Sequence, residues 1–305
     1  MSLLISFGFC FQTLFRIAYL CPTFLKRKQK QKQKTKTMLP EDCVSTILSN
    51  TSPLDACWSS LVSSSFCSAA NSDIVWKRFL PSDYEDIVSR SVTPLKFSSK
   101  KELFVCLCDP ILIDGGNKSF ALEKSTGLKS YILSARELSI TWGNQPMYWS
   151  WKFMSGSRFS EVAELRTIWW LEIHGKIRTQ TLSANTTYGA YLIMKISHRA
   201  YGLDSMPSEV SISIGDRVYT NTAYLSCREQ MEGLCYSNRT QMLRCRAAEG
   251  EGRVPCERKD GWMEIELGEF FSGEKDEEVK MSLMEVKGYQ LKAGLIIEGI
   301  EVRPK

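Results

Sequence analysis

Residues 134–179 read SARELSITWGNQPMYWSWKFMSGSRFSEVAELRTIWWLEIHGKIRT and hold five of the eight tryptophans of the chain. Two patterns are nested in this stretch. Between residues 167 and 177, branched and aromatic residues alternate with a period of two, which is typical of a half-buried β-strand. Further back, Trp142 and Trp149 flank the tetrad GNQP, whose glycine and proline favour a turn. The stretch therefore predicts a strand and, before it, a turn held between two indoles.

The turn between Trp142 and Trp149 has the chemistry of a sugar site. The C–H faces of a pyranose stack on an indole, and the side chain of Asn144 can both donate hydrogen bonds to hydroxyls and accept them. Met147, in the same loop, is apolar and suits a hydroxylated ligand less well. The spacing also fits two ordinary core tryptophans. The residues alone leave both alternatives open.

Segments with the same period of two recur through the C-terminal part of the chain. They occur at residues 188–196, 263–267 and 279–283, and the apolar run at residues 295–300 is expected to supply a final strand. Many short strands with turn signals between them and little helix predict an antiparallel β-sandwich. The alternation fades between residues 223 and 260, where we expect a long loop, and the charged residues 272–278 are expected to form a hairpin tip.

Residues 38–82 predict three short helices. Pro40 stands before two acidic residues, as at a helix start. The second helix is expected from Leu54 towards Phe66, and the third after Ser72, a suitable cap. Helices this short bury little surface, so a partner is expected to cover the rest. Residues 83–118 predict a structured bridge with a helix at 100–108.

The composition excludes several classes of function. Eight of the 39 basic residues and none of the 34 acidic ones lie in residues 1–37, which leaves 31 basic residues against 34 acidic ones from Met38 onward. This balance predicts no nucleic-acid surface. The sequence holds no nucleophile elbow, no phosphate loop and, among its 11 cysteines, no C-x-x-C pair. His174 beside Glu172 is interpreted as a structural pair, so we expect no catalysis, no cofactor and no metal. The scattered cysteines without paired spacing favour a reducing compartment.

The first residues form an apolar run, MSLLISFGFCFQTLFRIAYLCPTFL, followed by a basic run. The length permits a membrane span, but Arg16 would lie near its middle at a cost of about 3 kcal/mol. The basic residues follow the apolar run and no small-residue cleavage site is evident, which argues against a signal peptide. The basic run alone could act as a nuclear-import patch. We expect residues 1–37 to lie outside the fold.

Five blocks of the C-terminal part resemble the phloem protein 2 family of plant lectins, also called Nictaba-type. They are LSARELSITWGNQPMYWSW, SRFSEVAELRTIWWLEIHGKI, LSANTTYGAYLIMKI, ERKDGWMEIELGEFF and MSLMEVKGYQLKAGLIIEGIEVRPK, in the family's order. The resemblance implies a β-sandwich lectin for N-acetylglucosamine oligomers and the cores of N-glycans. It maps the family's functional tryptophan pair onto Trp142 and Trp149, with Asn144 between them as a hydrogen-bonding partner.

The segment LPEDCVSTILSNTSPLDACWSSLVSSSFCSAANSDIVWKRFLP resembles an F-box throughout. The resemblance implies docking onto a Skp-type adaptor and, through it, recruitment to a cullin–RING ubiquitin ligase. A small helical dimerisation element is the alternative. The implied adaptor contacts are Leu39, Pro40, Ile47, Leu48, Pro53, Val62 and Trp76.

These observations predict an α + β multidomain protein, in which a three-helix F-box precedes an antiparallel, jelly-roll-like β-sandwich. The expected parts are the head (1–37), the F-box (38–82), a helical bridge (83–118) and the lectin-like domain (119–305). The expected function is that of a non-catalytic ubiquitin-ligase adaptor, in the cytoplasm and nucleus, that captures glycoproteins by their sugars. We expect no nucleic-acid partner and no membrane anchor. The alternative function is an adaptor whose sandwich binds a protein and has lost sugar binding.

Overall fold

The computed structural model describes residues 39–226 and 252–305. The head at residues 1–37 and most of the long loop predicted at 223–260 lie outside the described residues. The chain divides between Phe79 and Leu80 into two compact units, which are described separately. Among the described residues, no helix combines the length and apolar character needed to cross a membrane.

The first unit contains four short helices over residues 39–79, where the sequence predicted three. They are α2 (Glu41–Ser49), α3 (Pro53–Ser59), α4 (Ser64–Ala70) and α5 (Asp73–Phe79). The predicted second helix is wrong in its length, because Ser63 starts a new helix within it. The Ser63 hydroxyl accepts a hydrogen bond from the backbone N–H of Phe66 at 3.3 Å, as the Ser52 hydroxyl does from Asp55 at 3.1 Å.

The core of the first unit lies where α2 packs against α4 and α5. Val44 and Leu48 follow one face of α2, and each is at most 1% exposed. Val75 and Trp76 of α5 are fully buried, and the Trp76 indole N–H donates to the Ala70 carbonyl at 2.7 Å. The indole therefore packs in the core without leaving its polar atom unpaired.

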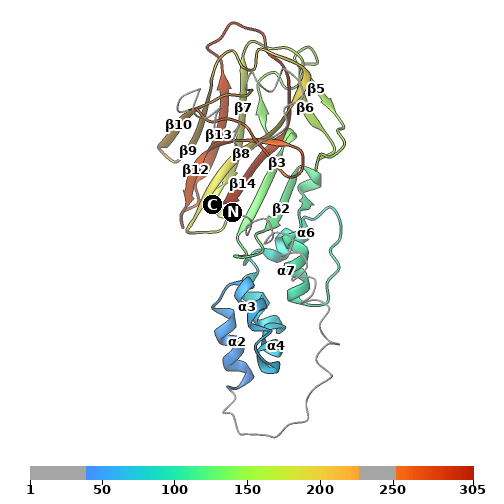
Figure 1. Ribbon diagram of the computed structural model, residues 1–305, viewed down its shortest axis with the longest axis vertical. Coiled ribbons are helices and arrows are strands. Elements are labelled where there is room, and N and C mark those ends of the chain that lie inside the picture. The colour runs from blue at the N-terminus through green and yellow to red at the C-terminus, as the bar shows by residue number, and fades with distance from the viewer. Residues whose placement is uncertain (1–38, 227–251) are drawn as a thin grey trace, which may run out of the picture. The chain divides into compact units, whose positions relative to one another are not determined.

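The second unit begins with α6 (Tyr84–Ser89) and α7 (Lys100–Cys108), and the latter has the predicted bounds. Ser99 caps α7, whose Leu103, Phe104 and Leu107 are fully buried. The guanidinium of Arg90 donates to both carboxylate oxygens of Asp114, at 2.8 and 2.9 Å. The bridge belongs to the same compact unit as the sandwich, and Figure 1 shows both helices at the ends of the strands labelled β2 (Lys118–Leu122) and β3 (Lys129–Ser134).

Two antiparallel sheets form the sandwich within the described residues, as predicted. The larger sheet comprises β1 (Ile111–Ile113), β2 (Lys118–Leu122), β3 (Lys129–Ser134), β5 (Trp149–Lys152), β6 (Val162–Leu165), β8 (Thr186–Tyr201), β11 (Cys256–Glu257), β12 (Met263–Ser272) and β14 (Ala293–Pro304). Its order is β1-β2-β3-β14-β8-β12-β11, with β6 also paired to β14 and β5 to β6. The smaller sheet comprises β4 (Ser139–Ile140), β7 (Leu171–Arg178), β9 (Ser208–Ile214), β10 (Arg217–Ala223) and β13 (Glu278–Glu285), in the order β10-β9-β13-β7-β4.

Glycines allow the two sheets to approach closely. A Cβ atom on Gly175 of β7 would lie 2.9 Å from Cδ1 of Ile300 in β14, and one on Gly268 of β12 would lie 2.6 Å from Cγ1 of Ile212 in β9. The aliphatic side chains of one sheet therefore fill the space that the glycines of the other leave free.

Two details of the predicted strands are wrong. Residues 272–278 are not a hairpin tip, because β12 and β13 belong to different sheets and this segment passes between them. The strand predicted from residue 167 begins only at Leu171, so Trp169, expected on the same side as Leu171, is 41% exposed. The chain before Leu171 is attached by the pairing of Ile168 with Lys292.

Candidate functional site

The turn between β4 and β5 presents Trp142 at the surface. Its φ of 54° lies in the left-handed region, which is unfavourable for a bulky residue, and its side chain is 40% exposed. Hydrogen bonds from the Gln145 N–H to the Trp142 carbonyl, at 2.8 Å, and from the Tyr148 N–H to the Gln145 carbonyl, at 2.9 Å, close two successive turns. Asn144 and Met147 are exposed on the same loop.

Two tryptophans of β5 fix the conformation of this loop by hydrogen bonds to its backbone. The indole N–H of Trp149 donates to the Thr141 carbonyl at 3.1 Å, and that of Trp151 donates to the Gly143 carbonyl at 2.8 Å. Both indoles therefore bind the backbone on either side of Trp142. Trp149 is 2% exposed and has no ring face available to a ligand, so the predicted stacking pair is not formed in this structure.

Tyr148 and Trp169 lie against Trp142, and Trp170 lies against Trp169; we call these four residues the aromatic cluster. The ring centroids lie 5.1 Å apart for Trp142 and Tyr148, 6.2 Å for Trp142 and Trp169, and 5.7 Å for Trp169 and Trp170. Trp169 and Trp170 come from the loop that precedes β7. The cluster thus combines two loops that are far apart in sequence.

A carboxylate stands at the edge of the aromatic cluster. Glu172 accepts hydrogen bonds from the Trp170 indole at 2.9 Å and the Thr141 hydroxyl at 3.1 Å, and its other oxygen lies 2.8 Å from Nε2 of His174. These contacts, the Trp170 bond first, hold the pKa of Glu172 below its usual range. Glu172 is therefore held as a hydrogen-bond acceptor at the edge of the aromatic cluster. The predicted His174–Glu172 contact is present.

A buried ion pair fixes the loop that carries Trp169 and Trp170. The side chains of Lys292 and Glu285 are each 3% exposed and in direct contact. The Lys292 ammonium also donates to the Trp169 carbonyl at 2.7 Å, and Glu285 accepts from the Gly288 N–H at 3.0 Å. Burial lowers the pKa of Lys292. Lys292 therefore connects the loop before β7 to the loop after β13.

Sequence reasoning found only part of this site. Trp142 and Asn144 lie where they were predicted, and their role in sugar binding stays a prediction. Trp169 and Trp170 were assigned to a strand, and Lys292 was not recognised. The sequence offered one signal: Trp169 and Trp170 are adjacent aromatic residues, so they break the alternation of apolar and polar residues that starts at Leu171.

The predicted adaptor contacts of the first unit fall into two groups. Leu39, Pro40, Ile47 and Val62 are exposed, Val62 by 72%. Leu48, Pro53 and Trp76 are buried inside the unit, so they belong to its core and cannot contact an adaptor directly. The large exposed apolar side chains of this unit, here called the apolar helical surface, are Leu39, Ile47, Trp58, Leu61, Val62 and Ile74. Within the described residues, no cluster of acidic, His and Cys side chains is suited to hold a metal.

The structure thus defines a class of protein that has a small helical module with exposed apolar side chains, and a β-sandwich with a partly exposed aromatic cluster. Two family models match the chain: the F-box domain at residues 37–78 and Phloem protein 2 at residues 128–304. The chain belongs to the family of F-box proteins with a phloem protein 2 domain.

Relatives in Arabidopsis thaliana have the same organisation over most of their length. F-box protein PP2-B15 is 56% identical over 279 residues, which cover 88% of this chain and 96% of the relative. F-box protein VBF is 52% identical over 279 residues, covering 88% and 99%. Among solved structures, a β-(1,4)-mannanase of Podospora anserina has a TM-score of 0.30 and 8% identity, covering 58% of this chain and 28% of that one, which is too weak to carry an argument.

Proposed function

We propose that this chain is a non-catalytic substrate adaptor of a cullin–RING ubiquitin ligase. The F-box binds a Skp-type adaptor, and the sandwich binds carbohydrate on target glycoproteins, with N-acetylglucosamine oligomers or N-glycan cores as ligands. The proposal includes activity in the cytoplasm and nucleus, where the ligase would meet its targets.

The adaptor half of the proposal is supported by the apolar helical surface. Six large apolar side chains are exposed on this unit of about forty described residues, and a partner that covers them would bury apolar surface. Ile47 and Val62 are suited to test it, since both are exposed and neither fills the core. Co-purification of a Skp-type adaptor with the full-length chain should be lost in Ile47→Asp and retained in Lys77→Asp, whose side chain is exposed on α5.

The carbohydrate half is carried by one observation: Trp142 is held partly exposed, in a strained backbone conformation, in an aromatic cluster that has the Glu172 carboxylate at its edge. An indole that could be buried and is instead supported at the surface fits a stacking platform for a pyranose. Tyr148 and Trp169 extend the platform, and Asn144 and Glu172 supply hydrogen-bonding groups for hydroxyls.

Titration with N-acetylglucosamine oligomers and N-glycan cores tests this half. Trp142→Ala is expected to weaken binding about tenfold, or about 1.4 kcal/mol. Phe271→Ala is the matched control, because Phe271 is an exposed aromatic residue on β12 outside the aromatic cluster. Absence of binding by the wild-type chain would leave the alternative, a protein-binding sandwich, which is favoured by the exposure of Met147 on the same loop.

A further inference from the structure

The outer face of the five-stranded sheet carries a continuous row that starts at the aromatic cluster. The strand register places Glu172 of β7 beside Met284 of β13, Met284 beside Glu209 of β9, and Glu209 beside Thr222 of β10. Neighbours in a row point to the same face of a sheet. Their partners at alternate positions, such as Val210 and Leu283, are buried between the sheets, so this row faces outward.

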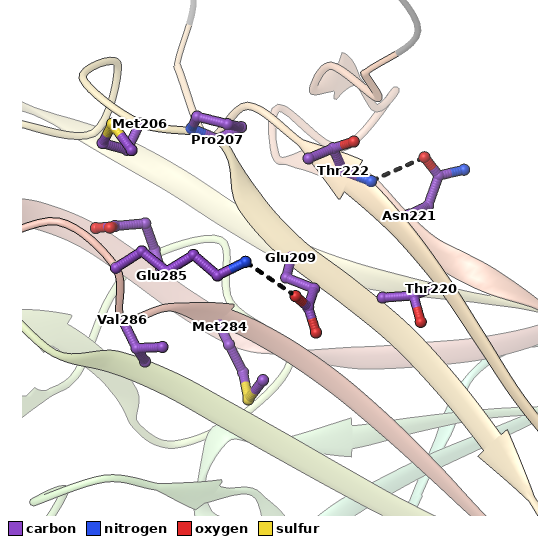
Figure 2. Close-up of a pocket in the computed structure, with 10 residues that line it drawn as sticks. Met206, Pro207, Glu209, Thr220, Asn221, Thr222, Met284, Glu285 and Val286 are labelled. Carbon is purple, nitrogen blue, oxygen red and sulfur yellow. Dashed lines mark hydrogen bonds and ion pairs between the residues drawn. The ribbon is translucent and has the colours of Figure 1, made fainter.

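A surface cavity of about 370 Å³ covers the part of this row that lies on β13, β9 and β10 (Figure 2). Its polar wall includes Thr220 and Thr222 of β10 and Glu209 of β9. The apolar part of the wall consists of Met206, Pro207, Met284 and Val286. Lys287 lies 3.7 Å from Glu209, and because the side chains are 80% and 41% exposed, this ion pair is weak and can open for a ligand.

The cavity and the aromatic cluster share one structural support. Glu285 lines the cavity and is in contact with Lys292, whose ammonium donates to the Trp169 carbonyl. Glu172, at the edge of the cluster, is three strands from Thr222, which corresponds to about 14 Å at the usual strand spacing. A short oligosaccharide can span that distance, whereas one sugar ring cannot.

The wall of the cavity suits an acetamido group. The methyl of such a group needs an apolar surface, which the methionines, proline and valine provide with shape-adaptable side chains. Its amide needs an acceptor and a donor nearby, which Glu209 and the threonine hydroxyls provide. A neutral sugar without the acetyl group would leave the apolar wall uncovered.

We propose that this cavity is a second subsite that receives an N-acetylated sugar residue of an oligosaccharide whose other end stacks on the aromatic cluster. The inference rests on the proposed carbohydrate function and extends it from one site to a chain-length-dependent pair of subsites.

The test compares three probes by titration against the full-length chain: N-acetylglucosamine, its β-1,4-linked tetramer, and the β-1,4-linked glucose tetramer, which is neutral and has hydroxyls in place of the acetamido groups. Wild type is expected to bind the N-acetylated tetramer at least about tenfold more tightly than the monomer. The glucose tetramer should lose that gain. Met284→Trp fills the cavity and should reduce tetramer affinity to that of the monomer, with monomer affinity unchanged.

Lys280→Trp is the matched control, because Lys280 points outward from the same strand in another row, beside Ser213 and Lys176. It should keep the wild-type chain-length profile. Thr222→Val, which conserves volume, is the second variant, and it should weaken the tetramer alone by about threefold to tenfold, the usual range for one hydrogen bond.

The outcomes separate the two proposals. Equal affinity of wild type for monomer and tetramer, or full tetramer affinity in both Met284→Trp and Thr222→Val, overturns the second subsite and leaves the aromatic site in place. Absence of binding to all three probes and to N-glycan cores overturns both.

Discussion

Replacing Lys292 by Met should be among the most destabilising single changes in the sandwich. The substitution keeps the length and apolar stem of the side chain but removes its charge. Glu285 then stays buried with the Gly288 N–H as its remaining described donor, and the Trp169 carbonyl loses the ammonium. Removing one partner of a buried ion pair leaves an uncompensated charge, which costs about 3–5 kcal/mol.

A loss of this size is a large part of the stability of an ordinary domain, about 5–15 kcal/mol. Lys292→Met should therefore shift the urea unfolding midpoint strongly, and the tryptophan fluorescence of the folded state should change because Trp169 is less firmly held. The double variant Lys292→Met with Glu285→Gln removes both charges and should recover part of the loss. Lys287→Met, on the same loop, removes an exposed ammonium and should cost less than about 1 kcal/mol.

Either of two results would contradict the stabilising role of the Lys292–Glu285 ion pair. One is a Lys292→Met variant as stable as Lys287→Met, which would mean that the buried carboxylate is compensated in another way. The other is a double variant that is no more stable than the single one, which would assign the loss to packing and not to charge.

The remaining predictions concern both units. Ile47→Asp should abolish adaptor binding without changing the melting temperature of the F-box, whereas Leu48→Glu should unfold it by placing a charge in its core; a folded, adaptor-binding Leu48→Glu variant contradicts this assignment. Trp149→Leu should lower the free energy of unfolding by about 3 kcal/mol, because it leaves a cavity and an unpaired carbonyl, and Trp142→Ala should lower it far less, which chemical denaturation can compare. The pKa of Asp114 is lowered from 3.8 to about 2, mainly by its hydrogen bonds from Arg90, so the acidic form is disfavoured in the folded state. Its contribution of about 2 kcal/mol is present above pH 4 and is lost as the pH falls towards 2, so the stability deficit of Asp114→Asn should shrink over that window; a deficit independent of pH contradicts it.

The sequence predicted the sandwich because the pattern of apolar residues is a local property that can be seen in each strand separately. The alternation at residues 279–283 corresponds to β13, the apolar run at residues 295–300 lies within β14, and Ser99 and Asp109 delimit α7. What it could not predict was pairing between distant strands. Nothing in residues 272–278 distinguishes a hairpin tip from a passage between sheets, because both are short, charged and exposed.

The candidate site was harder to predict, because burial is a property of the folded chain. Trp142 and Trp149 have the same side chain and similar neighbours, so the spacing that suggested a matched pair applied equally to both. The two side chains differ in exposure because Trp149 begins β5 and its ring points into the core, whereas Trp142 lies in the turn before that strand. Likewise, Lys292 resembles a surface lysine until the fold places Glu285 beside it.

The exposure of Trp142 is therefore explained by the contacts that hold its loop in this conformation. A partly exposed indole forgoes hydrophobic stabilisation, and its positive φ adds backbone strain, so the isolated loop would favour another conformation. The loop keeps this one because Trp149 and Trp151 bind the carbonyls at Thr141 and Gly143. Trp169 closes the other side and is itself fixed by Lys292. The indoles of Trp149 and Trp151 and one buried ion pair thus hold the exposed ring of Trp142 in place.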